Sequence, residues 1–342
     1  MKPGRRVSRA TIEDVAAAAG VSVATVSRAL RGMSNVAPHT RDRVFAVADQ
    51  LKYRADPHAS RLARGRTNTV AMAVPALSGW YFSRVVAGAE RVLSGEGYDL
   101  LLYGVSSAEE REGRISGGVP LHERADGLIL VDLRLPVDDL RHLAGTGGQV
   151  VTIGFTTGYF PAVKIDNVEA ARRATRHLIE SGHTDLGLVS GVPDVLEFTV
   201  PEDRRTGFLS ALDDAGITYH PEWDVPGDFT IDGGRRAFEQ LLAADERPTA
   251  VFVQSDEMAF GAMQAAREHG VRIPEDLSLI GFDDHDVSAA VGLTTIRQPI
   301  VAQGAAAARA LLDRIDGREG DGTVISFPTE LVTRSTVAPP AR

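Results

Sequence analysis

Residues 21–28 combine side chains that can donate hydrogen bonds to phosphate with small apolar side chains, a mixture suited to double-stranded DNA. The donors are the hydroxyl and guanidinium groups of Ser22, Thr25, Ser27 and Arg28. Val23 and Ala24 are small and apolar, and such side chains can contact the methyl group of thymine. If this segment is a helix, its first turn would point into the major groove. The alternative is a plain three-helix bundle in which these side chains are only solvated.

The distribution of charge also points to a polyanionic partner for the N-terminal part of the chain. The whole chain has 37 Lys and Arg against 46 Asp and Glu, a net charge of -9. Residues 1–66 hold 13 basic and 5 acidic side chains, a net charge of +8, whereas the remainder holds 24 and 41, a net charge of -17. A basic segment on an acidic body indicates that one part meets nucleic acid while the rest is kept off it. The alternative is an unevenly charged, solvated surface.

Three short helices are expected to position the DNA-binding side chains. Residues typical of helix starts and of a tight turn mark their boundaries: Thr11, Gly20, Ser22, Pro38 and Thr40. Asp14, three residues after Thr11, gives the first helix a near capping box. Three helices with a glycine-containing turn between the first two are typical of a helix-turn-helix unit, which we expect within residues 1–54.

A fourth, shorter helix is expected within the linker of residues 55–66. Asp56 suits an N-cap, Pro57 the first helical position and Gly65 the end. A helix of barely two turns is marginal alone in water, so it should form only against DNA or a second copy of the chain. Leu62 is its apolar residue among polar neighbours. This side chain can either open a base step in the minor groove or pack on the body.

The remaining chain, residues 67–342, predicts an α/β body. Near-continuous apolar runs alternate with amphipathic helical segments, which is typical of doubly wound parallel sheets. The expected strands are residues 70–74, 98–103, 127–131, 150–153, 186–190, 250–254 and 277–282. These units are too numerous for one sheet-centred half, so we expect two subdomains with a cleft between them. The first would span about residues 67–166 plus 299–327, and the second about 167–298 plus 328–342.

The sequence offers no signal for export or for a membrane. Residues 1–9 are basic, but no apolar segment follows them as in a secretory signal. There is also no run of about 18 apolar residues that could span a bilayer. Cysteine is absent, which excludes disulfides and thiolate metal sites and fits a reducing compartment. We therefore expect a cytoplasmic protein that does not meet a membrane.

No set of residues predicts catalysis. No glycine-rich phosphate loop follows a strand, and the nine histidines show no metal-ligand spacing. Asp283 and Asp284 follow a strand, where an enzyme could hold a metal, but the sequence places no third ligand with them. We expect no catalytic residue, no metal and no cofactor. The same strand ends suit a cleft that binds a small molecule.

Motifs along nearly the whole chain resemble those of the LacI/GalR family of bacterial repressors. They are residues 11–16, 20–22, 25–28, 53, 62, 164–167, 181–183, 204, 207–208, 255–259, 274–278, 281–284, 293–295 and 298–299. The resemblance implies a helix-turn-helix head on a periplasmic-binding-protein-like body. It also implies a homodimer that binds a near-palindromic operator, with each copy inserting its Leu62 into the minor groove. A small effector, expected to be a sugar, would release such a repressor from genes of carbohydrate uptake or catabolism.

The resemblance assigns roles to individual residues. The DNA-binding residues would be Thr11, Ser22, Val23, Ala24, Thr25, Ser27, Arg28, Thr40, Tyr53, Ala59 and Leu62. The effector-binding residues would be Tyr81, Phe82, Arg204, Phe229, Ser255 and Asp283. Their chemistry suits a sugar, since aromatic faces cover C–H surfaces while Arg204 donates to hydroxyls and Asp283 accepts from them. The aromatic residues could instead be ordinary core. Asp256 is interpreted as a helix N-cap.

Two departures from the family pattern and three alternatives stay open. Ala55 and Asp56 stand where relatives commonly carry Pro-Asn, which puts the strength of DNA binding in question. Gly154 follows a strand after which many relatives place a polar side chain. The effector could be a corepressor, such as a purine, rather than an inducing sugar. Alternatively, the chain could be a sugar-binding transport protein or a sugar-modifying enzyme, although the basic head and the missing catalytic set argue against these.

Overall fold

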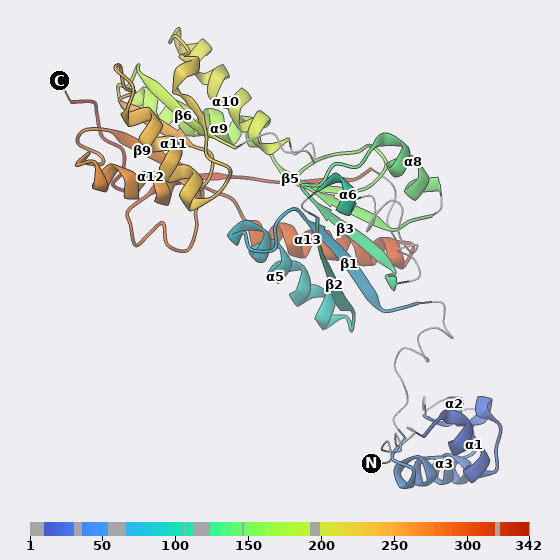
Figure 1. The fold of residues 1–342 in the computed structure, drawn as a ribbon. Coiled ribbons are helices and arrows are strands. Elements are labelled where there is room, and N and C mark those ends of the chain that lie inside the picture. The colour runs from blue at the N-terminus through green and yellow to red at the C-terminus, as the bar shows by residue number, and fades with distance from the viewer. Residues whose placement is uncertain are drawn as a thin grey trace. The chain divides into compact units, whose positions relative to one another are not determined.

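The computed structural model describes residues 10–30, 36–53, 66–105, 107–111, 124–145, 147–191, 199–318 and 322–341. The chain divides into two compact units, Met1–Thr67 and Asn68–Arg342, here named the head and the body. The described part of the head is helical, and the body contains two six-stranded sheets with helices around them (Figure 1). This architecture confirms the expected fold class. The expected short helix around Leu62 lies outside the described residues.

The head consists of α1 (Ile12–Ala19), α2 (Val23–Leu30) and α3 (Pro38–Gln50) within the described residues. Thr11 caps α1 as expected: its hydroxyl oxygen accepts from the Asp14 amide at 3.3 Å, and the Asp14 carboxylate accepts from the Thr11 amide at 2.9 Å. Gly20 ends α1 with φ +64°, a left-handed conformation that glycine adopts without steric cost. The turn between α1 and α2 is therefore fixed by local sequence.

A small apolar core holds the three head helices together. It contains Val15, Ala16, Ala19, Val26, Ala29, Val36, Val44 and Ala48, with Tyr53 packed against it. These residues recur three and four positions apart, so each helix turns one face inward. Tyr53, predicted to contact DNA, is half-buried at the end of this core. The core leaves the polar side chains of α2 on the outside.

The first sheet of the body has the strand order β11-β5-β4-β3-β1-β2, and all its pairs are parallel. Its strands are β1 (Thr69–Val74), β2 (Asp99–Gly104), β3 (Gly127–Val131), β4 (Val150–Ile153), β5 (Ala162–Ile165) and β11 (Val324–Phe327). Helices α5 (Trp80–Gly95) and α13 (Ile300–Ile315) share an apolar core on one of its faces (Figure 1). Helix α8 (Val137–Gly145) packs on the other face, and the short α6 (Ala108–Arg111) follows β2.

The second sheet has the order β12-β10-β9-β8-β6-β7. Its strands are β6 (Leu186–Ser190), β7 (Asp224–Pro226), β8 (Ala250–Val253), β9 (Ser278–Asp283), β10 (Thr294–Arg297) and β12 (Glu330–Val332). Helices α9 (Asn167–Glu180) and α10 (Val200–Ala215) cover one face, while α11 (Ile231–Leu242) and α12 (Asp256–Glu268) cover the other. A 3₁₀ turn, η2 (Pro221–Trp223), precedes β7. Only β12 runs antiparallel to its neighbour, β10.

The chain crosses between the two sheets three times, each time in a very short segment. Residue 166 joins β5 to α9, residues 298–299 join β10 to α13, and residues 328–329 join β11 to β12. Strands β5 and β11 are neighbours at the crossing, with Ile165 beside Phe327. Strands β10 and β12 are neighbours beyond it, with Arg297 beside Glu330. The crossings therefore lie next to one another in space.

Each of the seven expected strands has a counterpart in the structure, whereas β5, β7, β10, β11 and β12 were not expected. Lys164 interrupts the apolar pattern of β5, and two threonines and Arg297 do the same in β10. Strand β11 lies at an edge, where its side chains alternate between exposed and half-buried. Within the described ranges, every helix is too short or too polar to cross a lipid bilayer.

Candidate functional site

The first turn of α2 presents the side chains that were expected to contact DNA. Ser22, Val23 and Ala24 are exposed, and the Val23 side chain retains 40% of its accessible surface. Thr25 is half-buried, as are Ser27 and Arg28 in the next turn, while Val26 and Ala29 face the core. A small apolar side chain exposed at a helix start is available for an apolar contact, as expected for a thymine methyl group.

The hydroxyl groups at the helix starts are partly occupied within the head. The Ser22 oxygen accepts from the Thr25 amide at 3.2 Å and lies 2.9 Å from the Thr25 hydroxyl. Thr11 is exposed, but its hydroxyl belongs to the α1 cap. The Arg28 Nε donates to the Ala24 carbonyl at 3.1 Å, and Thr40 is half-buried in the first turn of α3. Ala59 and Leu62 lie outside the described residues, so the contacts expected of all these side chains stay predictions.

In the body, Arg204 and Asp283 form a buried ion pair. Their side chains are 6% and 9% exposed, and Arg204 Nη2 lies 3.7 Å from Asp283 Oδ1. The guanidinium stacks on the Phe282 ring, 3.5 Å from its centroid. Its Nε donates to Asn167 Oδ1 at 3.0 Å and its Nη1 donates to the Gln254 carbonyl. Such a complete set of partners is what keeps a charged group stable away from water.

Asp283 is also held by residues that lead into the first subdomain. Gln298, in the second crossing segment, donates from Nε2 to Asp283 Oδ1 at 2.7 Å. Gln303 on α13 donates to Gln298 Oε1 at 3.0 Å. Burial raises the pKa of Asp283 to about 6, although the charge of Arg204 acts in the opposite direction. The position of this carboxylate is therefore coupled to both subdomains.

Asp132 is a member of this site that the sequence reasoning missed. It follows β3 directly, is 5% exposed, and accepts a hydrogen bond from the Tyr81 hydroxyl. Burial raises the pKa of Asp132 to about 7, opposed by the positive charge of Arg204. Burial and the negative charge of Asp132 raise the pKa of Tyr81. The available signal was an aspartate directly after the apolar run of residues 127–131. Asp283 similarly ends the apolar run of β9.

Strained backbone marks the same strand ends. Non-glycine residues with positive φ include Asp132 (+49°) after β3, Phe229 (+53°) after β7, and Asp283 (+120°) with Asp284 (+57°) at the end of β9. Such conformations are costly for residues with a Cβ and concentrate at functional sites. The four angles thus give independent support for a site at the carboxyl ends of these strands, where parallel sheets bind ligands.

The other residues expected at the effector site differ in what surrounds them. The Phe82 ring stands edge-on to Tyr81, at 5.2 Å between centroids, and packs on the first sheet's core. The Phe229 ring covers the backbone of Gly191, where an added Cβ would come within 2.0 Å of the ring. The Ser255 hydroxyl accepts from the Met258 amide and caps α12. The interpretation of Asp256 as the N-cap was therefore wrong, since Ser255 takes that role.

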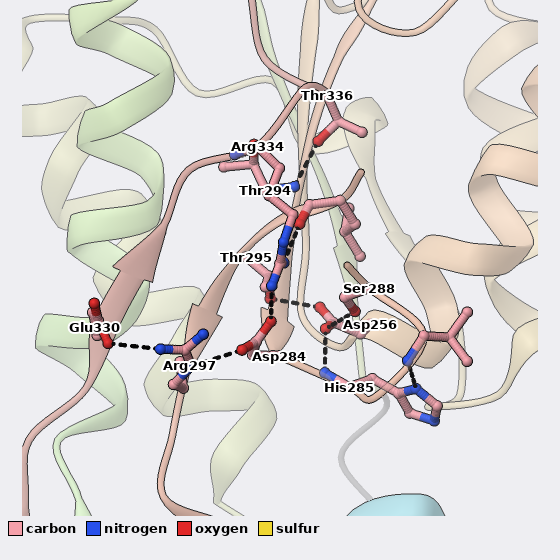
Figure 2. A network of polar contacts seen from close by, with 12 residues as sticks. Asp256, Asp284, His285, Ser288, Thr294, Thr295, Arg297, Glu330, Arg334 and Thr336 are labelled. Carbon is pink, nitrogen blue, oxygen red and sulfur yellow. Dashed lines mark hydrogen bonds and ion pairs between the residues drawn. The ribbon is translucent and has the colours of Figure 1, made fainter. Parts of the chain in front are cut away.

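Asp256 instead joins a polar network (Figure 2) in which its side chain and those of Ser288 and Thr295 are fully buried. Its Oδ2 accepts from the His285 amide at 2.8 Å and from the Ser288 hydroxyl at 2.6 Å, and its Oδ1 accepts from the Thr295 hydroxyl at 2.6 Å. Burial and the nearby charge of Asp283 raise the pKa of Asp256 to about 7.

Asp284 belongs to the loop of residues 283–288 and is held by two arginines. It pairs with Arg297 at 2.7 Å and with Arg334 at 2.6 Å (Figure 2). The loop of residues 283–288 is thus tied to β10 by Arg297 and to the C-terminal segment by Arg334.

This loop also contacts the first subdomain. Trp80, at the start of α5, donates from its indole nitrogen to Asp286 at 3.1 Å, and its ring lies 4.4 Å from the His285 ring. Arg84 lies 3.6 Å from Asp286 in an exposed ion pair. The Glu257 carboxylate accepts from the Trp80 backbone amide. Contacts between the two subdomains therefore include the Tyr81–Asp132 group facing Arg204 and the Trp80 contact with this loop.

Comparisons with known proteins agree with this geometry. Residues 11–56 match the model of the bacterial regulatory proteins of the lacI family, and residues 175–337 match that of a periplasmic binding protein-like domain. Catabolite control protein A of Priestia megaterium is 33% identical over 95% of this chain and 98% of its own length. The HTH-type transcriptional repressor CytR of Escherichia coli (strain K12) is 35% identical over 98% of both chains.

Solved structures have a similar fold. The lac repressor dimer bound to operator and the anti-inducer ONPF superposes with a TM-score of 0.84 at 27% identity, covering 97% of this chain and all of that chain. The complex of the transcriptional regulator CelR with cellobiose gives a TM-score of 0.70 at 32% identity, covering 96% of this chain and all of that chain. The chain belongs to the lacI family of bacterial regulatory proteins, and it is a DNA-binding transcription regulator.

Proposed function

We propose that this protein is a homodimeric repressor that leaves a near-palindromic operator when a small sugar binds between its two subdomains. The observation that carries the proposal is the buried Arg204–Asp283 pair facing Tyr81 and Asp132 from the other subdomain. A ligand that bridges these groups would alter the balance between arrangements of the two subdomains. The regulated genes would be those of carbohydrate uptake or catabolism, and the protein would act in the cytoplasm without catalysing a reaction.

The head supplies the DNA-binding half of the proposal. The exposed first turn of α2 carries Val23 and Ala24 as the proposed readers of bases, and the net charge of +8 over residues 1–66 suits the phosphate backbone. The lac repressor structure that this chain resembles is bound to operator as a dimer. We infer the same assembly here, with Ala59 and Leu62 of each copy at the minor groove.

The body supplies the effector half. Sugar hydroxyls can accept from a guanidinium and donate to a carboxylate, so Arg204 and Asp283 together match adjacent hydroxyl groups. The related CelR structure is a complex with cellobiose, which supports a sugar for this chain as well. Effector binding would lower operator affinity only if the ligand binds the released arrangement more tightly than the operator-bound one. The element that responds would be the short helix expected within residues 55–66, since such a helix is marginal alone.

The test is a titration of operator binding by the full chain. An operator is first selected from random duplexes, and binding is followed by fluorescence anisotropy as salt rises. We expect the affinity to fall on the order of a thousand-fold between about 50 and 200 mM salt. Sugars found by thermal shift are then added to the complex. Release by a sugar supports the proposal, tighter binding makes the ligand a corepressor, and a lack of any response in operator affinity contradicts it.

A further inference from the structure

The carboxylate of Asp132 fills the place that a side chain at position 154 would take. A Cβ added to Gly154 would lie 1.7 Å from Asp132 Oδ1 and 2.8 Å from its Cγ. Gly154 has φ +93°, which disfavours any residue with a side chain. The two positions adjoin because β3 and β4 are neighbours, with the Asp132 amide donating to the Ile153 carbonyl at 2.9 Å. The first subdomain thus presents a hydrogen-bond acceptor at the end of β3, in the place that a side chain at the end of β4 would otherwise occupy.

Both carboxylates of the site keep capacity to accept further hydrogen bonds. A carboxylate offers about four lone-pair positions. Asp132 accepts from the Tyr81 hydroxyl, and Asp283 accepts from Gln298 through Oδ1, the oxygen that also lies nearest Arg204. Asp132 comes from the first subdomain and Asp283 from the second. A ligand between them would therefore meet acceptors on two sides.

Arg204, the cation of this group among the described residues, is already engaged. Arg204 uses Nε toward Asn167, Nη1 toward the Gln254 carbonyl and Nη2 toward Asp283, which leaves about two of its five N–H groups for a ligand. Asp132 and Asp283 both act on its charge. Further negative charge comes from Glu257, which acts on Asp283. Above neutral pH, where Asp132 with a pKa of about 7 and Asp283 with a pKa of about 6 are both ionised, two negative charges face the single positive charge of Arg204, so an anionic ligand would be repelled.

We infer that Asp132 determines effector specificity, and that the effector is an uncharged molecule that donates hydroxyl groups to Asp132 and Asp283. Molecules whose polar groups are phosphates or carboxylates are excluded from this site. The inference rests on the proposed effector-binding function and narrows it to a class of ligand. It also explains the departure from the family pattern at Gly154, because Asp132 supplies the hydrogen-bond acceptor from the neighbouring strand.

The experiment compares neutral and anionic probes on the full-length protein. Cellobiose, ribose and glucose are tested beside ribose 5-phosphate, glucose 6-phosphate and gluconate, by thermal shift and then by calorimetry. We expect at least one neutral probe to bind and each anion to bind more weakly than its neutral parent. In Asp132→Asn, which keeps the shape of the side chain, the affinity for that neutral probe should fall about tenfold or more.

Asp126→Asn is the matched control. Asp126 precedes the same strand at its other end, where it accepts from the Asn68 amide at 2.8 Å. Its substitution should leave probe affinity unchanged.

Three results would overturn the inference. They are an anionic probe that binds more tightly than its parent, unchanged affinity in Asp132→Asn, and equal losses in Asp132→Asn and Asp126→Asn. Each of these leaves operator binding and its release by a ligand in place. The proposed function fails separately, when no probe of either class alters operator binding by the wild-type protein.

Discussion

The start of α2 and the Arg204–Asp283 site both carry polar side chains for recognition, yet they differ in their surroundings. In the head, Ser22, Val23 and Ala24 are exposed and lie on a small core of alanine and valine side chains. In the body, the ion pair is almost fully buried and each group has protein partners. The head can meet a polyanion through many weak, solvated contacts, whereas the body offers a few groups that have already lost their water.

The two regions also differ in the features that destabilise or stabilise their folded states. Buried carboxylates with raised pKa values and non-glycine residues with positive φ both destabilise the folded body. The head has no comparable strain in α2, and its stability depends on caps and a small core. Substitutions at the buried site of the body should therefore change its free energy of unfolding by large amounts, with a decrease for Arg204 and an increase for Asp132. Substitutions in the head should have modest effects.

The largest effect is expected for Arg204→Ala. Removing the guanidinium leaves Asp283 buried without its cation, so the free energy of unfolding of the body should fall by about 3–5 kcal/mol. The response to effector should also be lost. Arg236→Ala is the matched control, since that side chain and its partner Asp228 are both 53% exposed, and it should cost about 1 kcal/mol or less. Similar losses in urea unfolding of the two variants would contradict the contrast between buried and exposed groups.

A smaller effect of opposite sign is expected for Asp132→Asn. The unfolded pKa of this carboxyl is near 3.8 and the folded pKa is about 7, so between these values the folded state holds a proton that the unfolded state releases. Its contribution to stability therefore decreases as pH rises from about 4 to 7. At pH 8 the variant should be more stable than wild type by on the order of 2 kcal/mol, and at pH 4 the difference should vanish. A difference that does not vary with pH would sink this prediction.

The third prediction concerns the head. Thr11→Ala removes the hydroxyl that accepts from the Asp14 amide, so the free energy of unfolding of the head should fall by about 1 kcal/mol. Thr11→Ser keeps the cap and should recover most of that loss. The melting of the body should be unchanged in both variants, because Thr11 belongs to the other compact unit. Amide exchange measured for head and body separately would reveal any coupling between them.

The smallest effect is expected at the exposed edge of the contact between subdomains. Arg84 and Asp286 are 43% and 61% exposed, so Arg84→Ala should change stability by about 0.5 kcal/mol, and high salt should abolish the difference. Arg91→Ala provides the comparison, since Arg91 is an exposed residue on the same helix. A loss above about 2 kcal/mol in Arg84→Ala would show that this contact behaves like the buried pair rather than like a surface.

Much of the fold was predictable because strong local patterns specify it. Thr11, Gly20 and Ser22 mark helix boundaries that the head adopts, and continuous apolar runs became seven of the strands. The remaining strands depend on tertiary pairing. Strand β12 has three residues and gains its place by pairing antiparallel with β10, which no local pattern reports.

The site was predictable in part. Arg204 and Asp283 stood out because charged residues beside apolar runs need partners, and the structure brings them together. Asp132 was missed, although Gly154 was recognised as unusual. The link between these two positions depends on β3 lying beside β4 and on a positive φ at both residues, which are properties of the folded backbone. The N-cap of α12 was predicted one residue too late, at Asp256 rather than Ser255, because the sequence alone does not fix the residue at which that helix begins.

The three crossings between the sheets have a mechanical consequence. Each consists of one or two residues, and the pairing of β5 with β11 and of β10 with β12 ties them side by side. Sliding or twisting one subdomain against the other would break these ladders, whereas rotation about the line through the crossings would bend only a few backbone angles. The angle between the two subdomains is therefore the feature of the body that should change most easily. The proposed effector, near Asp132 and Asp283, would lie beside the crossings, since Gln298 in one of them donates to Asp283, and it would need to alter only that angle.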